Sequence, residues 1–286
     1  YIESSSYFSE QGKYPVIYLS LKDMKEKTWE ECSKKIKRII SNVYNQYEII
    51  RDSLNQRDLK IFDEAWLETL ESNNSNAIKE LSEYVSKYYQ KKVIILIDEY
   101  DTPIVSAYEN GYYEEAIAFF RNFYSSALKD NEYLQLGVMT GILRVAKEGI
   151  FSGLNNLSVY TVLDEKYSSS FGLTQEEVEQ ALEYYDLKDN FQEVKEWYDG
   201  YLFGNTEIYN PWSIINYLSK EKIAAYWVNT SNNFLVYDLL EKANISIFEE
   251  LEKIFQGKEI CKTLDSAFSF QDMKNPQEIW QLLVHT

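Results

Sequence analysis

One short segment constrains the fold more than any other: a run of aliphatic residues that ends in two carboxylates. Residues 93–97 read Val-Ile-Ile-Leu-Ile, and Asp98 and Glu99 follow directly. An aliphatic run without alternation is typical of a strand in a parallel sheet that is buried on both faces. Because helical patterns lie before and after this run, the sequence predicts an α/β fold.

Two further segments complete the predicted sheet. Residues 16–21 read as a short buried strand, and residues 134–140 as another that stops at Gly141. Thr28 and Glu31 form a capping box at the start of an amphipathic helix, and we expect further helices at 58–70, 77–89 and 113–128. After these three strands, one more extended segment is expected at 159–163. Such alternation predicts a parallel sheet with helices on both faces.

Beyond residue 171 the pattern becomes mostly helical. Thr174 and Glu177 form a second capping box, and Asn210-Pro211 provides a cap and first turn for another helix. We see no strong strand in this half, and we read Asp199-Gly200 as a turn. The sequence therefore predicts a partial α/β core over residues 1–168 and a mostly α-helical lid or second domain over residues 169–286.

Composition excludes several classes of protein. The 46 acidic and 29 basic side chains give a net charge of −17, which repels nucleic-acid phosphates, so we expect no direct nucleic-acid binding. The longest aliphatic run is far shorter than the ~20 residues of a membrane-spanning helix, so we expect no membrane partner. Two cysteines cannot form a disulfide framework in 286 residues, which favours a cytoplasmic location. A single histidine excludes a multi-histidine metal site.

The acidic pair is the first candidate site. A buried parallel strand delivers Asp98 and Glu99 to the carboxyl edge of the sheet, where open α/β folds bind ligands. In P-loop nucleotidases, the first carboxylate at this place holds Mg²⁺ and the second orients the attacking water. The structural alternative is that Asp98 caps the next helix while Glu99 faces solvent.

The strand at 134–140 contributes the next candidates. A right-handed crossover places it beside residues 93–97, so that the Thr140 hydroxyl reaches the same edge as Asp98 and can contact a γ-phosphate or its water. Arg144 follows four residues later and can stabilise phosphate charge. Alternatively, Thr140 satisfies a turn at Gly141, and Arg144 forms a surface ion pair.

A phosphate-binding loop is absent from these 286 residues. Such a loop requires G-x-x-x-x-G-K-[ST], because backbone amides and the lysine hold the phosphates while the hydroxyl binds Mg²⁺. Gly-Lys occurs only at Gly12-Lys13 and Gly257-Lys258, and neither pair has the second glycine or the hydroxyl residue.

Several motifs together resemble one family. Residues 93–103 resemble the second acidic motif of the bacterial AAA-ATPase-like family, whose members look like signalling P-loop ATPases. Further matching stretches follow in family order, at residues 140–144, 150–156, 171–174, 197–201, 209–213 and 226–231. The match covers nearly the whole chain.

The resemblance implies roles for the candidate residues. It assigns Mg²⁺ binding to Asp98, water orientation to Glu99 and phosphate sensing to Thr140 and Arg144, with ATP and Mg²⁺ as ligands. Family members are commonly fused to a C-terminal nuclease-like domain of the PD-(D/E)XK superfamily. Because the phosphate loop precedes this region in the family, we expect the chain to be an internal fragment that is inactive alone, with unpaired strand edges.

Three functional hypotheses remain at this stage. The chain is part of an ATP-dependent switch that couples nucleotide state to a downstream nuclease-like domain, or it is a non-catalytic ATPase-like scaffold. A third hypothesis is a metal-dependent hydrolase that uses Asp98, Glu99 and Asp101.

Overall fold

The computed structural model describes residues 3, 5–69, 74–143, 157–227, 234–264, 270 and 272–285. The chain forms two compact units. The first contains Tyr1–Leu157 together with Asp238–Val284, and the second contains Ser158–Tyr237. The division at residues 168 and 169 stays a prediction.

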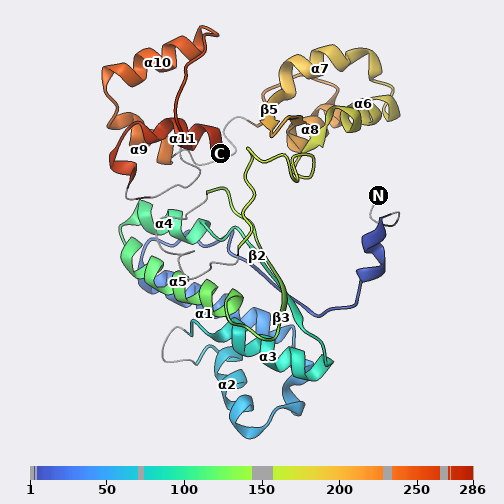
Figure 1. Ribbon diagram of the computed structural model, residues 1–286, viewed down its shortest axis with the longest axis vertical. Helices are drawn as coiled ribbons and strands as arrows, with labels where there is room; N and C mark the ends of the chain where they lie inside the picture. Colours follow the sequence, from blue (N-terminus) through green and yellow to red (C-terminus); the bar gives the residue numbers. More distant parts are fainter. Residues whose placement is uncertain are drawn as a thin grey trace. The chain divides into compact units, whose positions relative to one another are not determined.

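A three-stranded parallel sheet organises the first unit (Figure 1). Its strands β1 (Val16–Ser20), β2 (Val93–Asp98) and β3 (Leu134–Met139) lie in the order β1-β2-β3. The register pairs Ser20 with Asp98 and Ile97 with Met139, so all three strands end at one edge. This arrangement confirms the predicted α/β class and the parallel sheet.

The helices that connect these strands form a continuous layer. They are α1 (Trp29–Asn45), α2 (Gln56–Trp66), α3 (Ala77–Tyr89), α4 (Thr102–Asn110) and α5 (Tyr113–Leu128), and a 3₁₀ turn, η3 (Glu48–Ser53), follows α1. Thr28 accepts the Glu31 N–H at the start of α1, as the sequence predicts. The bounds of α3 and α5 match the predicted ranges. Helix α4 was not predicted; it begins three residues after Glu99 and has only nine residues.

One face of the sheet is covered and the other is open. On the covered face, Ile17, Ile95 and Ile97 are at most 1% exposed. On the open face, Tyr18, Leu136 and Val138 are 46%, 53% and 40% exposed. The prediction of helices on both faces is therefore not met among the described residues. Within the described residues, β3 pairs with β2 alone, so the other edge of β3 has no strand partner.

Residues near the C-terminus also belong to the first unit. The Phe270 ring lies 4.9 Å from the ring of Tyr108 on α4 and 5.6 Å from that of Tyr113 on α5. Three helices occur in this region: α9 (Phe234–Glu241), α10 (Ile245–Phe255) and α11 (Glu278–His285), with a short 3₁₀ turn at η5 (Asp272–Lys274).

The second unit is a small α/β structure. Its helices are α6 (Gln175–Tyr184), α7 (Phe191–Tyr198) and α8 (Pro211–Lys220), and the predicted capping box at Thr174 and the Asn210 cap are both present. A short antiparallel sheet joins them, with β4 (Leu173–Thr174), β5 (Asp199–Phe203) and β6 (Thr206–Tyr209) in the order β4-β6-β5. Its core is aromatic and aliphatic: Val178, Leu182, Val194, Tyr198, Tyr209, Ile214 and Tyr217.

Two predictions about extended structure were wrong. Residues 159–163 form no strand. Conversely, the second unit contains the small sheet that the sequence did not predict, and Asp199-Gly200 begins β5 rather than forming a turn. Its strands have two to five residues, so they are too short to show a clear alternation of polar and apolar positions.

Candidate functional site

The carboxyl ends of the three parallel strands gather oxygen-bearing side chains around Asp98. Thr140, directly after β3, donates a hydrogen bond of 2.6 Å from its hydroxyl to Asp98 Oδ1. From β1, the hydroxyls of Ser20 and Tyr18 each lie 3.4 Å from Asp98 Oδ2. Successive side chains along a strand point to opposite faces of the sheet. Asp98 therefore lies on the same open face as the residues that pair with it on the neighbouring strands. Asp98 is half-buried and Thr140 is exposed.

Glu99 occupies the turn that follows β2. Its backbone has φ of 53°, in the left-handed region that costs a residue with a Cβ on the order of 1–2 kcal/mol. The Thr102 hydroxyl donates a hydrogen bond of 3.0 Å to Glu99 Oε2, and the Thr102 N–H donates to the Glu99 carbonyl at 3.2 Å. A positive φ also occurs at six other described non-glycine residues, so it is the position directly after Asp98, and not the strain alone, that marks this turn.

Asp101 holds the segment after β3. Its side chain is almost fully enclosed, with the residue only 3% exposed. Oδ2 accepts the N–H groups of Ile142 and Leu143 at 3.0 and 2.7 Å. Burial raises the pKa of Asp101 to about 6, the two N–H groups act to lower it, and the nearby Glu99 raises it further.

The structure brings most of the predicted site residues together. Asp98 and Thr140 are in direct contact, and Glu99 follows Asp98 in the chain. Arg144 lies outside the described residues. Sequence reasoning missed Ser20 and Tyr18, although a polar residue at the end of the strand at 16–21 follows the same rule that selected Thr140.

The oxygen atoms at this edge suit a hard divalent cation. Mg²⁺ prefers carboxylate, hydroxyl and water oxygens, and Asp98 with its hydroxyl neighbours offers such a set on an open face. Among the residues that the structure describes, no group of three or more His, Cys, Asp or Glu side chains is arranged to hold a metal ion.

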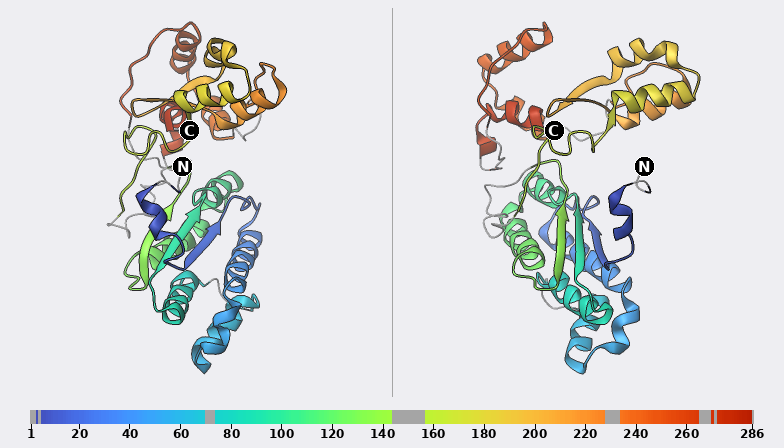
Figure 2. Two further views of the ribbon diagram at one scale, coloured as in Figure 1. Left: turned by 90° about the vertical axis from the view of Figure 1, so that its right-hand side faces the viewer. Right: turned by 45° about the vertical axis from the view of Figure 1, so that its right-hand side comes forward.

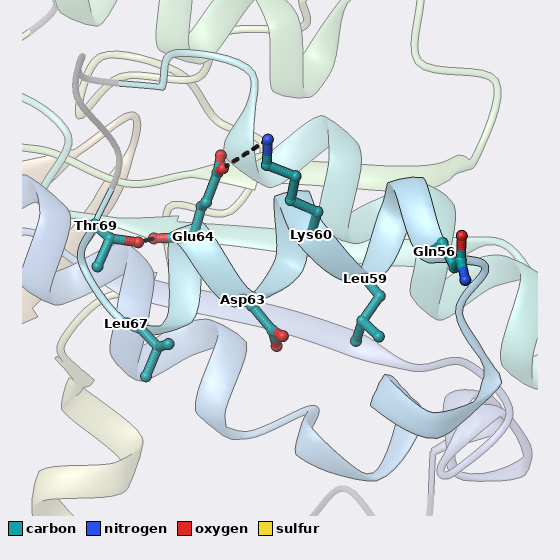
Figure 3. Close-up of a pocket in the computed structure, with 7 residues that line it drawn as sticks. All are labelled: Gln56, Leu59, Lys60, Asp63, Glu64, Leu67 and Thr69. Atoms are coloured by element: carbon teal, nitrogen blue, oxygen red, sulfur yellow. Dashed lines mark hydrogen bonds and ion pairs between the residues drawn. The ribbon is translucent and has the colours of Figure 1, made fainter.

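A hollow on α2 is an alternative candidate site. It has a volume of about 350 Å³ and is lined by Gln56, Leu59, Lys60, Asp63, Glu64, Leu67 and Thr69 (Figure 3). All of these residues belong to α2 or the turn after it, and α2 lies beside the amino ends of the strands, opposite the Asp98 edge (Figures 1 and 2). Lys60 and Glu64 form an exposed ion pair there, which is typical of a solvated helix face.

Comparison with known proteins identifies the family of this chain. A family model described as a predicted AAA-ATPase matches residues 1–151, which is more than half of the chain. The chain therefore belongs to the AAA-ATPase-like family, which confirms the resemblance over residues 1–151. The resemblance of the later motifs and the nuclease-like fusion stay predictions.

A similar curated protein is known only by its position in a genome. It is an uncharacterized protein in the vnfD 5′ region of Azotobacter chroococcum mcd 1, 29% identical over 192 residues. The match covers 67% of this chain and 36% of the relative, so this chain spans about a third of that protein. No solved structure matches significantly. Among the described residues, no helix has the length and apolar character needed to cross a bilayer.

Proposed function

We propose that this chain supplies the acidic and phosphate-sensing edge of an ATP-binding and ATP-hydrolysing module. The observation that carries this proposal is the hydrogen bond between Thr140 and Asp98, because it joins the ends of two parallel strands on an open face. Membership of the AAA-ATPase-like family supports the same reading.

Each residue has a distinct role in this proposal. Asp98 holds the metal, while Glu99, fixed in its strained turn by Thr102, orients the attacking water. Thr140 contacts the γ-phosphate with its hydroxyl, and Arg144 stabilises the charge on the phosphates. Asp98 would hold Mg²⁺, and the ion would supply positive charge to neutralise the phosphates.

We propose that the phosphate-binding loop lies outside these 286 residues, which contain no G-x-x-x-x-G-K-[ST] motif. In our proposal the strand that carries the loop lies along the unpaired edge of β3, next to Thr140. We further propose that the module is cytoplasmic and couples its nucleotide state to a PD-(D/E)XK nuclease-like domain.

The proposal is tested in the full-length protein by Glu99→Gln and Asp98→Asn. We expect E99Q to bind ATP with Mg²⁺ as the wild type does but to hydrolyse it about 100-fold more slowly or worse, because the water loses its base. We expect D98N to weaken Mg²⁺-dependent ATP binding. Glu115→Gln, on the exposed first turn of α5, is the matched control and should change neither property.

Two results separate the rival functions. Full-length protein that binds no ATP would favour the non-catalytic scaffold. Phosphoester hydrolysis that needs Mg²⁺ but no nucleotide, and that is lost with D98N, would favour the metal-dependent hydrolase. The contacts of Asp101 give that last hypothesis no support, since both of its known partners are backbone N–H groups.

A further inference from the structure

Asp101 stands where a helix cap is expected, yet its side chain does not cap the helix. It is the N-cap residue of α4, and its carboxylate makes no hydrogen bond to that helix. Pro103 lies in the first turn and has no N–H, and the Ile104 N–H donates to the Asp101 backbone carbonyl instead. The carboxylate is thus available for another partner, although it is buried.

That partner is the segment of residues 140–143, which we call the sensor loop. Besides the two N–H groups bound by Asp101, the loop is attached through its backbone to the turn after β2. The Thr140 N–H donates to the Ile97 carbonyl at 2.9 Å, and the Tyr100 N–H donates to the Thr140 carbonyl at 3.0 Å. The Tyr100 hydroxyl donates to the Leu143 carbonyl. Hence both ends of the sensor loop are fixed.

Close packing at Gly141 shows that the contact is shaped for this carboxylate. A Cβ atom at Gly141 would lie 2.5 Å from Asp101 Oδ1 and 2.7 Å from Tyr100 Cε1. Real Cβ atoms do not approach other atoms so closely. The absence of a side chain at position 141 is therefore what allows Asp101 and Tyr100 to hold the loop.

We propose that Asp101 is a positioning residue that fixes the sensor loop and thereby holds the Thr140 hydroxyl against Asp98. The proposed consequence for catalysis rests on the proposed function, whereas the attachment of the loop does not. Asp101 Oδ2 accepts two successive backbone N–H groups, from Ile142 and Leu143, so one buried oxygen attaches the loop at two points.

Two other roles for Asp101 fit the contacts less well. A helix cap is excluded by the absence of any cap hydrogen bond. A metal ligand or base needs access to its ligand, whereas Asp101 is 3% exposed and Oδ2 is occupied by two N–H groups.

The test compares Asp101→Ala with Asp101→Asn in the full-length protein. Asparagine keeps a carbonyl oxygen that can accept both N–H groups, whereas alanine keeps none. In D101A, hydrogen exchange at the Leu143 N–H should accelerate about 10-fold or more, since losing one such bond costs about that factor. D101N should stay close to the wild type. The control is Asp63→Ala on α2, which removes a carboxylate that accepts hydrogen bonds from Arg51 of η3.

ATP turnover supplies the second readout. We expect kcat to fall on the order of 10- to 100-fold in D101A with KM for ATP little changed, because a displaced Thr140 acts on the chemical step. D101N should recover most of this loss. Gly141→Ala leaves Asp101 intact but forces the loop away, so it should reproduce both effects of D101A.

The outcomes distinguish this proposal from the proposed function. If D101N loses activity as fully as D101A, Asp101 acts through its charge and the positioning role is overturned. Unchanged exchange at Leu143 in D101A overturns the attachment itself. If the wild-type protein hydrolyses no ATP, the proposed function fails, but the exchange pattern still decides whether Asp101 holds the loop.

Discussion

The Thr140 hydroxyl lies 2.6 Å from Asp98 Oδ1, although 42 residues separate the two in the chain. The contact arises because β2 and β3 are parallel neighbours that end at the same edge of the sheet. The helices α4 and α5 connect the strands across one face, as a parallel crossover requires. The edge thus combines an acidic group with a hydroxyl donor directed at it.

Replacing Thr140 tests the role of this hydroxyl. In the full-length protein, we expect Thr140→Val to lower kcat for ATP hydrolysis on the order of 100-fold, because the hydroxyl that donates to Asp98 and orients its carboxylate is lost. Thr140→Ser retains the hydroxyl and should stay within a few-fold of the wild type. Steady-state turnover and equilibrium ATP binding together check this expectation, and equal turnover in both variants would contradict it.

The sequence predicted the sheet and its acidic edge because these depend on local patterns. The unbroken aliphatic run of β2 and the carboxylates after it require only that the strand be buried and parallel. The crossover rule predicted that Thr140 lies at the same edge of the sheet as Asp98. The hydrogen bond between the two side chains was not predicted and is seen only in the structure.

The remaining features depend on tertiary contacts that no local pattern shows. Glu99 has a backbone conformation that favours glycine, and its sequence neighbours do not indicate it. The sequence offered Asp101 only as a residue of the metal-dependent hydrolase, whereas its carboxylate accepts the N–H of Leu143, 42 residues later in the chain. The short strands of the second unit depend on pairing with one another.

The strain at Glu99 leads to a stability prediction. At φ of 53°, glycine is favoured over alanine, so Glu99→Gly should be more stable than Glu99→Ala by about 1 kcal/mol. The order of stability should reverse at Glu115 in the first turn of α5, where the alanine variant should be more stable than the glycine variant by about 1 kcal/mol. Urea unfolding of the four variants measures both differences. The same order at both positions would show that the turn is relaxed in solution.

Burial of Asp101 predicts a dependence of stability on pH. Burial raises the pKa of Asp101 from its ordinary value of 3.8 to about 6 in the folded chain, so the folded state binds the proton more tightly than the unfolded state. The resulting stability is fully present below about pH 4 and is lost as the pH rises to about 6. Asp101→Asn cannot titrate, so its free energy of unfolding relative to wild type should increase by roughly 2–3 kcal/mol over that window.

The measurement is the difference in unfolding free energy between D101N and wild type at a series of pH values. Taking the difference removes the effect of the net charge of −17, which is nearly common to both proteins. Asp63→Asn, at a half-buried carboxylate whose pKa is lowered by its hydrogen bond with Arg51, should show the opposite trend. A flat difference for D101N would mean that water reaches the Asp101 carboxylate.

The two faces of the sheet should respond differently to truncation. Ile95→Ala removes a side chain that is 0% exposed and should cost about 2–5 kcal/mol of unfolding free energy. Leu136→Ala acts on a side chain that is 53% exposed on the open face and should cost less than about 1 kcal/mol. Urea unfolding at several protein concentrations checks both values. If L136A cost as much unfolding free energy as I95A, the open face would be covered in solution. A cost that grows with protein concentration would identify a second copy of the chain as the cover, because only an intermolecular contact responds to concentration.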